Sequence, residues 1–135
     1  MNSLTLYRKF ALGLLGLWSL CSLGITPVFA GECDDLNEAV LDSCKDKSVT
    51  AKGPRVDMFE VPGYFMMADP AFSGGEGMQD YMAVGDAQII IHTFDEVQCP
   101  EDIEVKGTLT QTELEDDDGQ KHNAWLISVT EFKCL

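Results

Sequence analysis

The sequence predicts a mainly β domain: a small five-stranded barrel that carries one short N-terminal α-helix and is stapled by disulfide bonds. The clearest strand signal is the alternation of Ile103, Val105, Gly107 and Leu109 with polar residues, which is the period of a half-buried strand. Apolar residues at helical spacing precede the first strand. An even number of cysteines follows the N-terminal segment, as expected of a disulfide-bonded exported domain.

The first thirty residues predict a secretory signal peptide. Arg8 and Lys9 precede an apolar run over residues 10–25, and a small residue, Ala30, stands at the expected cleavage site. An uncleaved anchor would need roughly 20 unbroken apolar residues, and Cys21 lacks the preceding small residue of a lipoprotein. We therefore expect a periplasmic or secreted protein with no membrane span after cleavage, a helical segment at 31–47 and a barrel domain at 48–135.

The predicted mature chain is strongly acidic. Only seven of the nine Lys and Arg residues follow residue 30, against all 23 Asp and Glu residues, which gives that part a net charge of −16. Nucleic acid would be repelled by this charge. The excess of acid either serves solubility alone or offers a docking surface to a basic partner or a cation.

Four cysteines remain after residue 30: Cys33, Cys44, Cys99 and Cys134. Their spacings lack the Cys-x-x-Cys pattern of redox, zinc and haem sites, so two structural disulfides are expected. A continuous helix over residues 34–44 would hold Cys33 and Cys44 about 15 Å apart, which slightly favours bonds from the helix to the barrel. The alternative pairs Cys33 with Cys44 and Cys99 with Cys134, and it requires a broken or displaced helix.

The chain after the helix divides into five predicted strands. The first is bent at Gly53-Pro54, and the last places Trp125, Ile127 and Val129 on its inner face. The strands are expected at residues 48–58, 64–68, 86–94, 102–114 and 124–132. A long surface loop is expected at 71–85, and a hairpin tip at 115–120.

Several of these strings resemble the OB-fold barrel of small exported bacterial domains over residues 48–132. They are the glycine-bearing first strand, Gly-Tyr-Phe-Met-Met-Ala-Asp, Ile-Ile-Ile, and Ile-x-Val-x-Gly-Thr-Leu. The resemblance implies binding of oligonucleotides, oligosaccharides, metals or proteins through the sheet face and the loops that follow the first and fourth strands. The fold by itself does not choose among these ligands.

Catalysis and calcium binding are not expected. The chain has two histidines and neither a Gly-x-Ser-x-Gly nor a His-Glu-x-x-His motif. Aligning the acidic tip on Gly119 as a calcium loop puts Leu114 and Trp125 at ligand positions, so that pattern fails.

The function predicted first is therefore a non-enzymatic, monomeric binding or accessory domain without a cofactor, whose partner is an unknown protein or small ligand. Tyr64, Phe65 and Tyr81 are its candidate contact residues, beside the loop at 71–85. The alternative is a carrier of monovalent copper or silver, which would use thioether and imidazole ligands. Its candidate ligands are Met58, Met66, Met78, Met82, His92 and His122.

Overall fold

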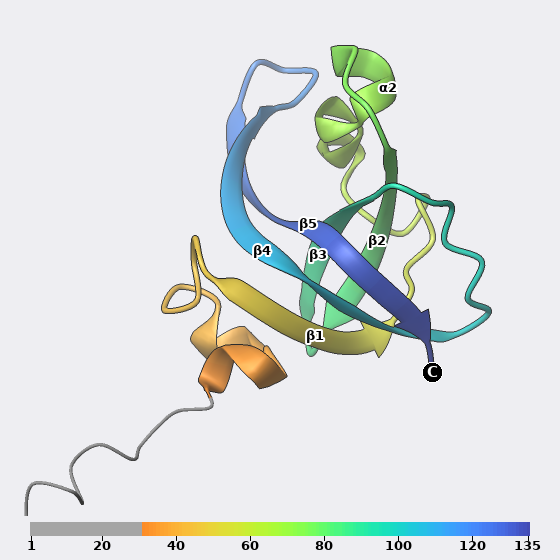
Figure 1. Ribbon diagram of the computed structural model, residues 1–135. Helices are drawn as coiled ribbons and strands as arrows, with labels where there is room; N and C mark the ends of the chain where they lie inside the picture. Colours follow the sequence, from red (N-terminus) through yellow and green to blue (C-terminus); the bar gives the residue numbers. More distant parts are fainter. Residues whose placement is uncertain (1–30) are drawn as a thin grey trace, which may run out of the picture. The chain divides into compact units, whose positions relative to one another are not determined.

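The computed structural model describes residues 31–135, which are mainly β with few and short helices (Figure 1). The predicted leader, residues 1–30, lies outside the described residues. The five strands are β1 (Ser48–Pro54), β2 (Met78–Val84), β3 (Ala87–Thr93), β4 (Asp102–Glu115) and β5 (Lys121–Cys134). The helical turns are η1 (Glu32–Asp35), η2 (Glu38–Val40), η3 (Gly63–Ala68) and α2 (Pro70–Ser73).

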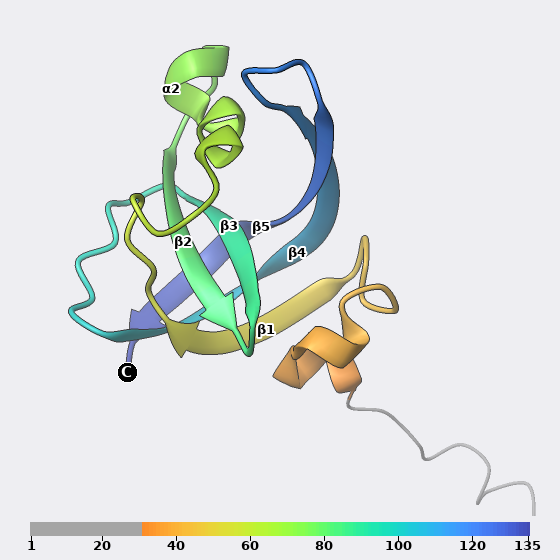
Figure 2. The same cartoon turned by 180° about the vertical axis from the view of Figure 1, so that it is seen from behind.

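The strands form one sheet in the order β1-β4-β5-β3-β2, which curls into a half-barrel (Figures 1 and 2). Every neighbouring pair is antiparallel except β3 and β5, which run parallel. The two ends of the sheet approach each other at a single bridge between Arg55 and Met82. The prediction of a mainly β, five-stranded, disulfide-bonded domain is thus confirmed.

Alternation sets the register of β4 and β5. Ile103, Val105 and Leu109 are fully buried on the inner face of β4, as predicted. Opposite them, Ile127 and Val129 are buried in β5, with Trp125 packed against the same cluster. The pairing of β4 with β5 shifts between Lys106 and Gly107, and β5 comes so close there that a Cβ atom at residue 107 would overlap the carbonyl oxygen of Ser128.

Two hydrophobic clusters lie on opposite faces of the sheet. The inner cluster fills the half-barrel, and the outer one lies beneath η3. Strand β3 serves both, since Ile89 and Ile91 are in the inner cluster and Ile90 is in the outer one. The outer cluster consists of Val61, Phe65, Tyr81, Ile90, Leu114, Ala124 and Leu126.

The predicted continuous helix over residues 34–44 is wrong. The segment forms η1, η2 and a turn, because the Leu36 N–H leaves the helical path and donates to the Thr50 carbonyl at the edge of β1, 2.9 Å away. The broken path brings Cys33 and Cys44 into a disulfide with 5.7 Å between their Cα atoms. The slight preference for bonds from helix to barrel is therefore wrong, and the second disulfide joins Cys99 to Cys134.

Two further predictions are wrong. One predicts a strand that is absent and the other omits a strand that is present, so the number of strands is still five. Residues 64–68 belong to the 3₁₀-helix η3, in which Phe65 is buried while its successors Met66 and Met67 are both exposed, so no alternation exists. The predicted loop at 71–85 contains β2. Both faces of β2 are covered and its polar side chains are hydrogen-bonded, which conceals the two-residue period.

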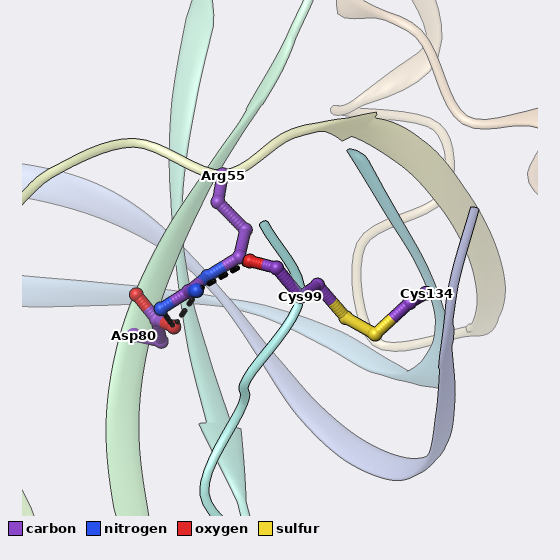
Figure 3. The surroundings of a disulfide bond; sticks show 4 residues. All are labelled: Arg55, Asp80, Cys99 and Cys134. Atoms are coloured by element: carbon purple, nitrogen blue, oxygen red, sulfur yellow. Dashed lines mark hydrogen bonds and ion pairs between the residues drawn. A yellow bond between two sulfur atoms is a disulfide. The ribbon is translucent and has the colours of Figure 1, made fainter. Parts of the chain in front are cut away.

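Arg55 ties the end of β1 to β2 and to the second disulfide (Figure 3). Its Nε donates to Asp80 Oδ2 at 3.0 Å, and its Nη1 donates to the carbonyl of Cys99 at 2.6 Å. Cys99 is fully buried and is bonded to Cys134 at the end of β5. One guanidinium thus links the end of β1 to β2 and, through Cys99 and its disulfide, to β5, next to the bridge where the two ends of the sheet approach each other.

Candidate functional site

Exposed apolar side chains gather in the connection between β1 and β2. Of the eight large, exposed apolar side chains in residues 31–135, five come from this connection and a sixth is Met78, the first residue of β2. Met66, Met67 and Phe72 line one groove, and Met58, Phe59 and Met78 line another. Apolar side chains left in water in such groups are typical of interaction surfaces.

A groove of about 570 Å³ lies between this connection and the β4–β5 hairpin tip. Both segments stand at the same end of the sheet (Figures 1 and 2). One wall is apolar and the other is acidic. Gly63, Tyr64, Met66, Met67 and Phe72 line the apolar wall, and Glu115, Asp116, Asp117 and Asp118 line the acidic wall. We call this site the tip groove.

The acidic wall is an ordered turn, as predicted for residues 115–120. Asp116 Oδ1 accepts the backbone N–H groups of Asp118 and Gln120, both at 2.9 Å. Gly119 takes a positive φ of 83°, which favours glycine. The backbone of the turn is thus ordered, and the exposed side chains of Glu115, Asp117 and Asp118 extend from it beside the groove.

His122 links the two walls of the tip groove. Its Nε2 lies 2.7 Å from Asp116 Oδ2, and its ring stacks on Tyr64 with 4.2 Å between ring centroids. The hydrogen bond from His122, followed by the one from the Gln120 backbone, lowers the pKa of the Asp116 carboxyl below its usual 3.8. The bound carboxylate therefore stays ionised in mildly acidic solution.

Only one of the three predicted contact residues lies at this groove. Tyr64 is half-buried and lines it, whereas Phe65 and Tyr81 are 4% and 5% exposed and pack in the outer cluster. An edge-on contact joins Tyr64 to Phe65, with 5.4 Å between ring centroids, and Phe65 in turn packs on Tyr81 of β2, with 6.0 Å between ring centroids, which places η3 on the sheet. Phe65 and Tyr81 thus pack beneath the tip groove, and Tyr81 also lines a second groove beside Arg55.

The six candidate ligands of the metal alternative do not converge on one place. Met82 is fully buried, and Met66 lines the tip groove. Met58 and Met78 line a second groove, of about 670 Å³, beside Arg55. His122 and His92 are hydrogen-bonded to Asp116 and Gln79. Within residues 31–135, no three His, Cys, Asp or Glu side chains are grouped to hold a metal ion.

His92 lies in a hydrogen-bonded network beneath η3. Its Nε2 is 2.8 Å from Gln79 Oε1, and Gln79 Nε2 donates to the Phe65 carbonyl and to Tyr81 Oη, both at 2.9 Å. Burial lowers the pKa of His92 below 6.5, although the charge of Asp69 and the Ala68 backbone oppose the shift. Burial also raises the pKa of Tyr81. The network joins η3, through the Phe65 carbonyl, to β2 and β3.

This network predicts a stability loss in mild acid. Because the pKa of folded His92 is lowered, the unfolded chain binds a proton first as the pH falls below about 6.5. Stability that is present above this pH should decrease until the folded pKa is passed. The imidazole C–H shifts should titrate below pH 6.5, and His92→Gln should flatten the free energy of unfolding between pH 7.5 and 5.5. A His92 pKa at or above 6.5 would contradict the burial argument.

Within residues 31–135, several acidic side chains on the strands form ion pairs with Lys or Arg, whereas three carboxylates at the β4–β5 hairpin tip do not. Glu104 in β4 lies between Lys133 at 3.1 Å and Lys52 at 3.5 Å, and the hydrogen bond from Lys133 is the main cause of its lowered pKa. Five of the seven Lys and Arg residues after residue 30 form such ion pairs. In this part of the chain, no Lys or Arg nitrogen lies within 4.0 Å of the carboxylates of Glu115, Asp117 and Asp118.

Sequence reasoning named Tyr64 and the hairpin tip, but it did not predict that the two walls of the tip groove face each other. Met67 and Phe72 stood in segments interpreted as a strand and a loop, and the acidic turn was considered a solvated hairpin tip. A signal was present in the strong acidity together with the methionine-rich connection, but nothing local to either segment places them opposite each other. No helix in residues 31–135 is long and apolar enough to cross a membrane. No family model, curated protein or solved structure matches the chain.

Proposed function

We propose that residues 31–135 are a non-enzymatic binding module of an exported protein and that the tip groove is its recognition site. The observation that carries this proposal is the groove itself, an exposed apolar wall facing Glu115, Asp117 and Asp118, whose carboxylates have no Lys or Arg nitrogen within 4.0 Å in residues 31–135. Neither wall stabilises the fold of the domain, because exposed apolar area and clustered like charge both oppose stability.

An OB-like barrel is the fold we propose for this module. The strand order, the parallel pairing of β3 with β5 and the bridge between Arg55 and Met82 agree with a closed barrel of that type. Barrels of this kind bind ligands through the connections after their first and fourth strands. Those two connections supply the walls of the tip groove.

Two disulfides indicate that the folded protein belongs to an oxidising, extracytoplasmic environment. Together with the predicted signal peptide, they support a periplasmic or secreted location for the module. Its ligand would then be another exported protein or a surface exposed to the same compartment.

The hydrogen bonds of the two histidines support binding over catalysis. His92 bonds to Gln79, and His122 bonds to Asp116. In residues 31–135, neither imidazole is hydrogen-bonded to a Ser, Thr or Cys side chain that it could activate as a nucleophile. The module is accordingly proposed to act through recognition alone.

Site-specific photo-crosslinking in the cells that produce the protein tests this proposal. A photoreactive phenylalanine at position 72, in the apolar wall, should give a discrete adduct whose partner is identified by mass spectrometry. The matched control carries the same group at Phe94, which is similarly exposed but does not line the groove. Equal adduct patterns at both positions, or none at either, would refute the groove as the recognition site.

A further inference from the structure

We propose that the tip groove takes a basic protein segment: a short stretch in which Lys or Arg side chains flank a bulky apolar one. The inference rests on the proposed binding function and specifies the chemistry of its partner. Three properties of the groove carry it: an exposed apolar wall, an opposite wall on which three carboxylates have no Lys or Arg partner in residues 31–135, and a brace that fixes the spacing between them.

The apolar wall presents side chains that the fold holds out in water. Phe72 is 68% exposed and Met67 is 60% exposed. The short helix α2 carries Phe72 between an Asp69 cap, whose carboxylate accepts the Ala71 N–H at 2.9 Å, and Gly74, whose φ of 78° ends the helix. Pro70 in the same turn is buried. Phe72 is therefore displayed by an anchored turn, and Met67 beside it can adapt to the shape of an apolar side chain.

The acidic wall has charge that the protein does not neutralise. Glu115, Asp117 and Asp118 stand in one turn, while the nearest lysine in sequence, Lys121, pairs instead with Glu113 at 3.4 Å. The carboxylates of the sheet face, by contrast, lie between lysines. Repulsion within the turn would be relieved by cations from a partner, and electrostatic steering would speed their approach.

The brace formed by His122 fixes the distance between the apolar wall and the acidic wall. His122 is held by Asp116 on one wall and stacks on Tyr64 of the other. A ligand that satisfies both walls must carry cationic and apolar groups within a few residues of each other. A metal ion alone would leave Phe72 and Met67 in water, and an anionic ligand would be repelled. A basic, apolar protein segment meets all these conditions.

A labelled seven-residue peptide of alternating Lys and Leu is the direct probe, titrated against the oxidised protein by fluorescence anisotropy at low salt. We expect saturable binding that weakens as salt is added. Peptides with Glu in place of Lys, or Ser in place of Leu, should not bind. Backbone amide shifts in NMR spectra should change along η3, α2 and the tip, and not beside Arg55.

Matched substitutions distinguish the contribution of each wall to peptide binding from general effects of a substitution on the protein. Phe72→Ser should raise the dissociation constant about tenfold, whereas Phe94→Ser should leave it unchanged. Asp117→Asn combined with Asp118→Asn should raise it at least threefold and reduce the salt dependence, and the exposed Asp42→Asn serves as the charge control.

Several results would overturn the inference. They are equal binding of the Lys and Glu peptides, no binding of either, equal effects of Phe72→Ser and Phe94→Ser, or shift changes confined to the groove beside Arg55. If crosslinking at position 72 nevertheless identifies a partner whose contacting segment is acidic or neutral, the recognition site stands and only the basic chemistry is wrong. If the peptide binds as expected but crosslinking at 72 fails, the proposed cellular function is what fails.

Discussion

Replacing Gly107 with alanine should destabilise the protein by about 3 kcal/mol. The added Cβ would overlap the carbonyl oxygen of Ser128 and stand 2.9 Å from the Cα of Val129. Both obstacles are backbone of β5, which cannot rotate away as a side chain could. The substitution must therefore displace β4 from β5 at the place where their register shifts. The free energy of unfolding, measured by denaturant titration with both disulfides intact, checks this expectation.

Gly63→Ala is the matched control for that experiment, because a Cβ at residue 63 would meet nothing within 4 Å. Its effect should stay within about 0.5 kcal/mol. Comparable losses in the two variants would show that the close approach of β4 and β5 at Gly107 is not what limits this position.

Removing the disulfide between Cys99 and Cys134 should cost about 4 kcal/mol, the second large effect we expect. Its cysteines are 35 residues apart, so the bond restricts the unfolded chain more than the bond between Cys33 and Cys44, 11 residues apart, which should contribute about 3 kcal/mol. The bond between Cys99 and Cys134 also holds the backbone of Cys99, whose carbonyl accepts a hydrogen bond from Arg55. Paired Cys→Ala variants, compared by thermal and denaturant unfolding, measure both.

The comparison between the two double variants is the informative one. Loss of the bond at Cys99 should lower stability more than loss of the bond at Cys33, by about 1 kcal/mol from loop length alone. The reverse order would mean that the N-terminal turns over residues 32–46 contribute more to the fold than their short loop suggests.

The sequence located β4 and β5 from the alternation of their inner residues, although Leu114, Ala124 and Leu126 of these strands are buried on the other face. It also located β3, which is apolar on both faces, from its continuous Ile-Ile-Ile run. It missed β2, because Tyr81 and Met82 are buried on opposite faces after the polar Gln79 and Asp80, so the strand has neither a two-residue period nor a long apolar run.

The N-terminal segment shows a different limit. The helical spacing of Leu36, Val40, Leu41 and Cys44 predicted one apolar side, on which Val40 is partly buried and the other three side chains are buried. It could not reveal that the Leu36 N–H donates to Thr50 or that Cys33 turns back to Cys44, since both contacts depend on where the sheet edge lies. Disulfide pairing is a property of the folded backbone, and periodicity left it open.

The candidate site was only partly predictable for the same reason. Tyr64 was identified from its aromatic character, but the residues that face it across the groove belong to a hairpin about fifty positions later in the chain. Which two connections face each other depends on the order of the strands in the sheet, and no local sequence pattern encodes that order.

The shared strand β3 has a consequence for how the molecule comes apart. Its consecutive residues Ile89, Ile90 and Ile91 are all fully buried, the outer two in one cluster and the middle one in the other. Loss of either cluster would expose apolar side chains of β3 to water, so each cluster stabilises the strand on which the other depends. Residues 31–135 should accordingly melt as one cooperative unit, with no partly folded state in which η3 has detached from an intact half-barrel.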